Sequence, residues 1–157
     1  MNEPASPPNA RDSQDLCAFH LRFGWTALLV FATLGLVLEG LHAYKSPAYL
    51  GVDREMRRLM WTLAHAHGVG LSLLHIGFAF TAARLGEAAA PESRKRRLEL
   101  ASKLLRAAAV LLPLGFFLGG FGAYEGDPGV GVFLTPIGAA ITWLAILLVA
   151  MVASERS

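Results

Sequence analysis

The residue types best suited to chemistry lie in the first half of the chain, where Glu39, His42, His65 and His67 interrupt apolar sequence. Glu39 and His42 are three residues apart, so on a helix they share one face. His65 and His67 are about 200° apart around a helix, so we expect them to point to nearly opposite neighbours. Carboxylates and imidazoles bind zinc, copper and non-haem iron. We therefore predict a transition-metal site formed by Glu39, His42, His65 and His67.

Haem b is the alternative cofactor for the same region. Two imidazoles would supply its axial nitrogens, and arginines would bind its propionates. The residues expected to hold it are His42, His65, His67, Tyr44, Arg57 and Arg58. The alternative without a cofactor is that the glutamate and the histidines only lock helices together and that the arginines anchor the helix at the membrane surface.

Two other reactive residues, His75 and Cys17, are not expected to belong to the site. His75 lies about 15 Å deeper than His65 at 1.5 Å per residue, so we expect it to stand outside the site, as a bystander or as one end of a separate site. Cys17 is the only cysteine and cannot form an internal disulfide, so we expect it to pack. The chain has no phosphate-binding glycine loop, nucleophile elbow or metalloprotease helix, so we do not expect an enzyme of those classes.

The elements that must position these residues are membrane helices. Hydrophobic residues make up 54% of the chain and charged residues 17%, and the charges are segregated. Four stretches contain no Asp, Glu, Lys or Arg: 23–38, 59–83, 107–124 and 128–154. About 20 apolar residues cross a bilayer as a helix. The sequence therefore predicts an all-α membrane protein with a four-transmembrane-helix bundle, with helices at about 18–43, 54–84, 100–124 and 130–154. Residues 1–15 are rich in proline and polar residues and are predicted to form a disordered tail.

The distribution of basic residues predicts the orientation. Ten of the 14 Lys and Arg residues lie in the tail, the loop between the second and third helices and the C-terminus, and four lie in the first loop. By the positive-inside rule we expect both termini to be cytoplasmic, and the membrane we expect is a bacterial inner membrane. The formal net charge is only +2 and topology accounts for it, so we infer no nucleic-acid partner. The expected partners are lipid and a membrane protein or a second copy of the chain.

A weak internal repeat relates the two halves. LGLVLEGLHAY at 34–44 matches LGFFLGGFGAY at 114–124 at six of eleven positions. A true duplication would relate two helical hairpins by a pseudo-two-fold axis along the membrane normal. In this alignment Glu39 and His42 correspond to Gly119 and Gly122, so only the first hairpin carries the polar groups.

The segment LAHAHG at 63–68 resembles the HAH segments in transmembrane helices of haem-copper oxidase-type subunits and of haem- and copper-containing membrane proteins of nitric-oxide metabolism. That resemblance implies haem or copper as the cofactor. The whole chain also resembles small uncharacterised bacterial four-helix integral membrane proteins, which imply no activity.

Three functions are open at this point. The leading hypothesis is a membrane protein that binds a metal or haem in the outer half of the first hairpin, as an electron-transfer or respiratory accessory component. The second is a non-catalytic structural subunit or assembly factor. The third is a small proton-coupled carrier that uses Glu39 and the histidines as a relay.

Overall fold

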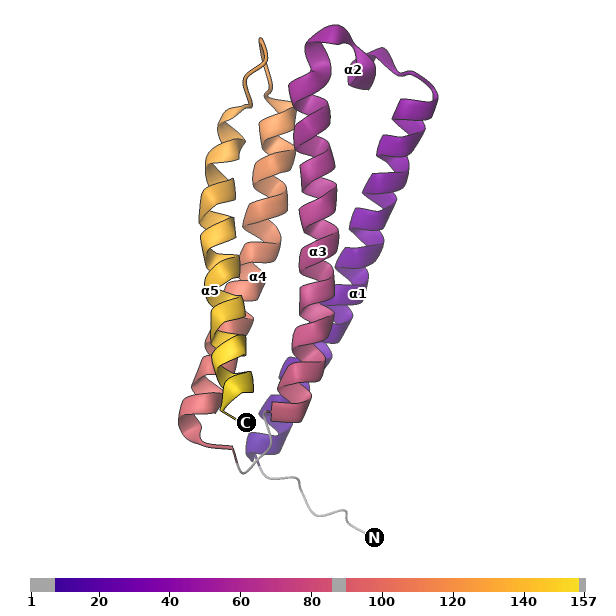
Figure 1. The fold of residues 1–157 in the computed structure, drawn as a ribbon. Helices are drawn as coiled ribbons and strands as arrows, with labels where there is room; N and C mark the ends of the chain where they lie inside the picture. The colour runs from indigo at the N-terminus through magenta and orange to yellow at the C-terminus, as the bar shows by residue number, and fades with distance from the viewer. Residues whose placement is uncertain (1–7, 86–89, 156–157) are drawn as a thin grey trace.

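The protein is a bundle of long helices (Figure 1). The computed structural model describes residues 8–85 and 90–155, with side chains from Gln14 onward. Among the described residues there is no β-strand, and the helices are α1 Pro8–Ala43, α2 Pro47–Leu50, η1 Val52–Arg54, α3 Glu55–Leu85, α4 Glu92–Phe121, η2 Val130–Phe133 and α5 Leu134–Ser154. Both described ends of the chain lie at one end of the bundle, called here the terminal end, and α2 lies at the other, the α2 end.

In the described chain, the four long helices are long and apolar enough to cross a membrane, which confirms the predicted four-helix membrane bundle. The predicted bounds were wrong at two places. Residues 8–15, expected in a disordered tail, form the first turns of α1, while residues 1–7 lie outside the described part. α4 begins at Glu92 because the charged run after it consists of good helix formers, and it ends at Phe121, where Gly122 caps it.

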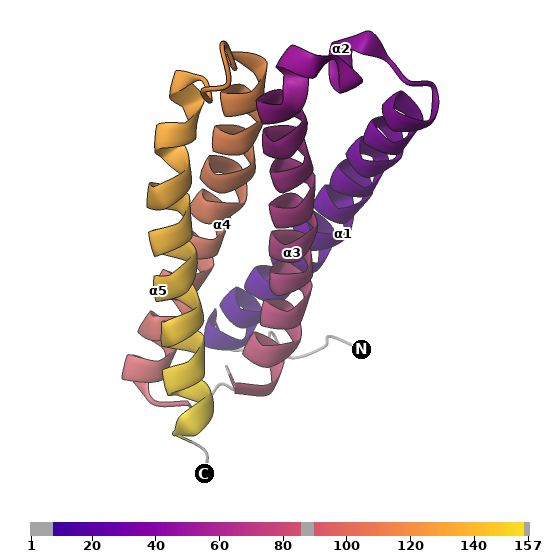
Figure 2. The same cartoon turned by 45° about the horizontal axis from the view of Figure 1, so that its top comes forward.

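The helices pack in the order α1, α3, α4, α5, with α1 and α5 on the outside. Only 11% of the apolar stretch of α1 and 17% of that of α5 is buried, against 44% for α3 and 39% for α4. α1 crosses behind α3 near the terminal end and leans away from it toward the α2 end (Figures 1 and 2). The bundle is therefore closed at the terminal end and open between α1 and α3 at the α2 end.

The short helix α2 explains the opening. It contacts both α1 and α3 and carries Tyr49, which is 4% exposed and stacks at 6.5 Å on Trp61 of α3. A buried aromatic ring next to the hairpin connection holds the ends of the two helices apart. The largest core cluster lies at the other end, where Phe78, Leu98, Ala101 and Val152 are buried. Cys17 packs against this cluster, as predicted.

Candidate functional site

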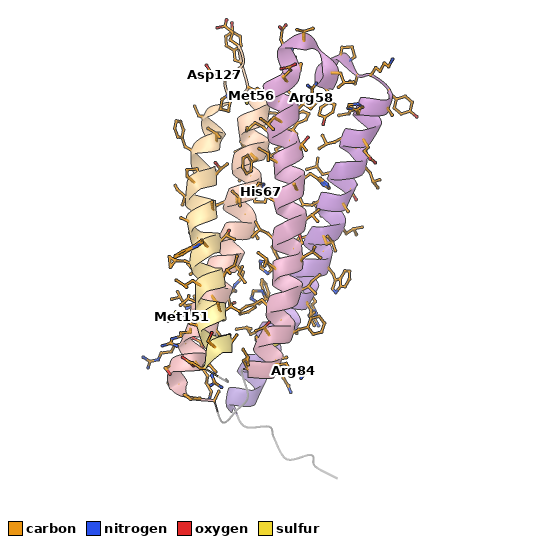
Figure 3. All side chains as sticks on the ribbon, viewed as in Figure 1. Met56, Arg58, His67, Arg84, Asp127 and Met151 are labelled. Carbon is orange, nitrogen blue, oxygen red and sulfur yellow. The ribbon has the colours of Figure 1, made fainter. Side chains whose placement is uncertain are left out.

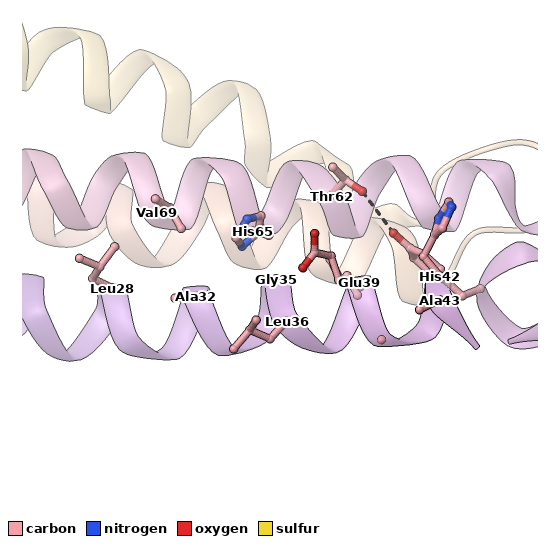
Figure 4. A pocket seen from close by; sticks show the side chains of 13 residues that line it. Leu28, Ala32, Gly35, Leu36, Glu39, His42, Ala43, Thr62, His65 and Val69 are labelled. Atoms are coloured by element: carbon pink, nitrogen blue, oxygen red, sulfur yellow. Dashed lines mark hydrogen bonds between the residues drawn. The ribbon is translucent and has the colours of Figure 1, made fainter. Parts of the chain in front are cut away.

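The predicted site region is a groove between α1 and α3 at the α2 end, called here the hairpin groove (Figure 4). Its volume is about 1170 Å³, and it is open along one side. Glu39, His42, Tyr49, Thr62 and His65 supply its polar lining, and leucine, valine, alanine and glycine supply the rest. The groove therefore combines one carboxylate and two imidazoles with largely apolar walls.

His65 is directed at α1. Its Nδ1–H donates to the carbonyl oxygen of Phe31 at 2.8 Å. Its ring lies against Gly35, where an added Cβ atom would overlap the imidazole. His65 thus crosses the α1–α3 contact at the floor of the groove, and Gly35 is the residue on α1 that makes room for it.

His67 points the other way, as the helical spacing predicted. Its Nδ1–H donates to the carbonyl of Leu63 one turn earlier, and its ring stacks on Phe116 of α4 at 4.8 Å. Figure 3 places His67 between α3 and α4, away from the groove. The two histidines therefore belong to different helix contacts.

The remaining predicted cofactor residues do not gather at the groove. Arg57 lies over the Trp61 ring, 5.7 Å from its centroid, and donates from Nε to the carbonyl of Gly120 at 3.3 Å. Arg58 pairs with Glu55 at 4.0 Å, and Tyr44 is 89% exposed at the end of α1. Arg57 therefore contributes to the α3–α4 contact, Arg58 lies on the surface of α3, and Tyr44 lies at the connection to α2.

The described residues do not fit the predicted metal or haem site. No three His, Cys, Asp or Glu side chains within the described chain come close enough to hold a metal ion. Glu39 and His42 are exposed on α1, His65 is engaged with a backbone carbonyl, and His67 faces α4. His42 of α1 lines the groove between α1 and α3, whereas His67 lies between α3 and α4, so α3 separates the two imidazoles that would hold a haem. The arrangement gives no support to Cu, Fe, Zn or haem at this place.

A different polar cluster is buried at the terminal half of the bundle. His20 of α1 and His75 of α3 are both fully buried, and their Nδ1 atoms are 2.8 Å apart. His20 Nε2 lies 2.8 Å from Oγ of Ser102 on α4, and Arg106 Nη2 lies 3.2 Å from the same oxygen. We call Arg106, Ser102, His20 and His75 the histidine chain. It joins three helices that are otherwise held by apolar contacts.

When both imidazoles are neutral, their partners determine the direction of every hydrogen bond in the histidine chain. His75 Nε2–H donates to the Leu105 carbonyl at 3.2 Å, since a carbonyl only accepts. His75 Nδ1 is then an acceptor, so His20 Nδ1–H donates to it and His20 Nε2 accepts from the Ser102 hydroxyl. Arg106 donates to Ser102. Four hydrogen bonds therefore run in one direction from Arg106 to the backbone of α4.

Aromatic rings enclose the two imidazoles. Phe78 lies 4.5 Å from His20 and Phe23 lies 4.5 Å from His75, both measured between ring centroids. Arg106 covers Phe19 at 4.9 Å. The histidine chain is thus shielded by apolar rings, and its one charged member is at its exposed end.

A line of polar and small residues on α3 connects the two regions. Thr62, His65, Gly68, Ser72 and His75 follow one another at spacings of three or four residues, which places them on one face of the helix. Ser72 is buried and donates to the carbonyl of Gly68 at 2.7 Å. This face, called here the α3 seam, runs along α1 from the hairpin groove to the histidine chain.

Phe31 of α1 interrupts the seam. Its ring occupies the space beside Gly68, where an added Cβ atom would overlap it. Gly68 lies between His65 and Ser72 in the seam, so the ring separates the groove from the buried chain. The Phe31 carbonyl is also the acceptor of His65, which ties the imidazole and the ring to the same residue.

The sequence prediction missed His20, but it placed His75 outside the hairpin site, and the structure has His75 in a separate cluster. His20 lies just before the charge-free run 23–38, beside Arg22, and was passed over as part of the helix start. The signal that points to it is the seam on α3. In an antiparallel hairpin, a polar residue deep in one helix needs a facing partner at a similar distance from the connection, and Arg22 and His20 are the polar residues of α1 next to that level, of which His20 is buried.

No protein-family model, curated protein or solved structure matches the chain.

Proposed function

We propose that the protein is a proton-conducting membrane carrier in which protons pass along the α3 seam, with the histidine chain as its inner segment. The observation that carries this proposal is the histidine chain. Its two imidazoles are fully buried, their Nδ1 atoms are 2.8 Å apart, and His20 Nε2 lies 2.8 Å from Oγ of Ser102. Ionisable residues inside a membrane bundle are costly, so they mark proton paths and similar functions by default.

The hydrogen-bond directions describe one transfer step. The Ser102 hydroxyl proton passes to His20 Nε2, and the His20 Nδ1 proton passes to His75 Nδ1. Ser102 regains a proton from water at its side of the chain. His75 then carries protons on both nitrogens. Water that enters along the seam would take one of them, because the ring nitrogens are bonded to His20 and to the Leu105 carbonyl and not to Ser72. Rotation of the two rings restores the starting arrangement. The net result of the step is the transfer of one proton from Ser102 to His75, and each O–H or N–H bond that breaks is matched by one that forms.

The position of the chain gives it access to water on the terminal side. Arg22 follows His20 by two residues, and Arg106 follows Ser102 by one turn; both are exposed. Arginines near the end of a membrane helix reach toward the headgroup layer, so Arg106 would lie where water meets the chain. With the orientation that the basic residues favour, this is the cytoplasmic side of an inner membrane, and the hairpin groove opens toward the outer side.

Proton flux into liposomes tests the proposal. Purified protein is reconstituted with a trapped pH-sensitive dye, a pH step is applied, and valinomycin with potassium cancels the membrane potential. We expect flux above that of empty liposomes, and we expect His75→Gln to reduce it to the empty-liposome level. Glutamine keeps a donor and an acceptor for Leu105 and His20 but does not carry a proton at these pH values.

His67→Gln is the matched control, because it removes an imidazole from the same helix outside the seam, and it should keep the wild-type flux. Wild-type flux equal to that of empty liposomes, or full flux in His75→Gln, contradicts the proposal. The first result, together with a lowered thermal stability of His75→Gln, would favour the structural subunit instead, since the histidine chain also ties α1, α3 and α4 together.

A further inference from the structure

We infer that the hairpin groove is a binding site for a lipophilic organic cation, with Glu39 as its counter-charge. The site itself is independent of proton conduction. Only its role as the cargo site of the carrier rests on the proposed function.

The charge pattern of the groove points to a cation. Glu39 is the one residue lining it with a formal charge when the imidazoles are neutral; no Lys or Arg lines it. The ion pairs of the described chain lie elsewhere: Arg58 pairs with Glu55, and Arg94, Arg96 and Arg97 pair with Glu92 or Glu155. A carboxylate at membrane depth without a partner is costly, so a cation that enters the groove gains a strong electrostatic interaction.

The polar groups around Glu39 do not supply that charge. His42 on α1 and His65 on α3 face the groove with it, and Tyr49 and Thr62 share a contact of 3.4 Å between their hydroxyls. The His65 Nδ1–H is already donated to Phe31. Figure 4 shows Glu39 directed from α1 toward α3, into the space between them. The Glu39 carboxylate is therefore available to bind a ligand.

The shape and the walls favour a lipophilic ligand over a hydrated ion. The groove holds about 1170 Å³, which exceeds what a metal ion requires, and Leu28, Ala32, Leu38 and Val69 form much of its wall. Gly40 has nothing within 4 Å of an added Cβ atom, so the α1 wall is not packed there. Only 11% of the apolar stretch of α1 is buried, and the groove beside it is open along one side, so we expect that side to face lipid. A bulky cation that partitions into membranes can enter from that side.

The test measures binding of tetraphenylphosphonium to the purified full chain in detergent by equilibrium dialysis. Tetraphenylborate, an anion of nearly the same size and shape, is the charge control. We expect saturable binding of the cation and none of the anion. Glu39→Gln should weaken cation binding at least about tenfold, because it removes the charge and keeps the volume.

Glu55→Gln is the matched variant, a carboxylate at the same end of the bundle but outside the groove, and it should bind like the wild type. Ala32→Phe keeps Glu39 and fills the groove, so it should also weaken binding. Equal binding of the anion and the cation, or wild-type affinity in both Glu39→Gln and Ala32→Phe, overturns the inference. Each of these results leaves the proton-flux measurement unaffected, so the two proposals can fail separately.

Discussion

The two repeat segments end α1 and α4 at the same end of the bundle but pack in opposite ways. Gly40 in the first segment has open space around it, whereas at its counterpart Gly120 an added Cβ atom would press on the Trp61 ring and on Met60. Gly119, the counterpart of Glu39, lies in contact range of Met60 and Val132. The second segment uses these glycines to pack α4 closely against α3 and η2, whereas the first leaves the equivalent positions open and polar.

The same contrast holds along the first hairpin itself. At the α2 end, α1 and α3 separate around a groove that contains a carboxylate without an ion-pair partner in the described chain. At the terminal end the two helices meet through fully buried and mutually satisfied imidazoles. A polar group in a membrane bundle is either paired by its neighbours or available to a ligand, and this hairpin contains one region of each kind.

The largest expected difference between these regions is in stability. His20→Leu leaves His75 Nδ1 without its donor and the Ser102 hydroxyl proton without its acceptor in an apolar setting, so we expect it to lower the free energy of unfolding by about 2–4 kcal/mol. Thermal unfolding in detergent measures this. His42→Leu on the same helix removes an exposed imidazole and should change stability by less than about 0.5 kcal/mol. An equal loss of unfolding free energy in the two variants would show that the histidine chain does not stabilise the bundle more than the exposed His42 does.

The aligned glycines give the next largest effect. Gly120→Ala should lower the free energy of unfolding by about 1–3 kcal/mol, because the Trp61 ring must shift to admit the methyl group. Gly40→Ala meets nothing and gains helix propensity, so its stability should be unchanged or higher by up to about 1 kcal/mol. The measurement is again thermal unfolding. A destabilised Gly40→Ala would mean that the first hairpin is closed in solution.

Comparison with the sequence prediction shows which features local patterns determine. The four helices follow from the length of the charge-free runs, and the opposite directions of His65 and His67 follow from helical geometry alone. The predicted gathering of Glu39, His42, His65 and His67 assumed that residues at one depth meet. Depth does not specify the face, so the prediction could not say which of His65 and His67 faces α1; in the structure His67 lies against Phe116 of α4. The prediction missed His20 because the partner of His75 is defined by helix packing, not by spacing within one segment.

The opening of the groove was also beyond the sequence prediction. It depends on Tyr49, a loop residue in the prediction, whose burial against Trp61 holds α2 between the two helices. The hydrophobic periodicity of α1 and α3 contains no information on how Tyr49 packs. A polar residue in a loop next to a hairpin is therefore as important for the site as the residues on the helices.

A third test compares the two ends of the α3 seam through Phe31, and it rests on the proposed proton path. Phe31→Ala removes the ring beside Gly68, which lets water join His65 to Ser72, so we expect proton flux to rise about fivefold, since apolar constrictions exclude water. Leu29→Ala is the matched control, because Leu29 is 69% exposed on the lipid side of α1. A flux unchanged by Phe31→Ala would mean that this ring does not limit the path.

The smallest expected difference concerns ion pairs at the two ends. Glu155 pairs with both Arg94 and Arg97, and its side chain is 34% exposed, whereas Glu55 pairs with Arg58 at 4.0 Å and is 78% exposed. Pairs of this kind contribute about 0–1 kcal/mol, more when several charges share one site. Glu155→Gln should therefore cost about 0.5–1 kcal/mol of unfolding free energy, and Glu55→Gln should cost less than about 0.3 kcal/mol. Salt should reduce the first loss, because screening weakens exposed pairs. A Glu55→Gln loss equal to that of Glu155→Gln would show that the terminal end is not held more firmly by its charges, which would leave the histidine chain and the apolar core as the sources of its closure.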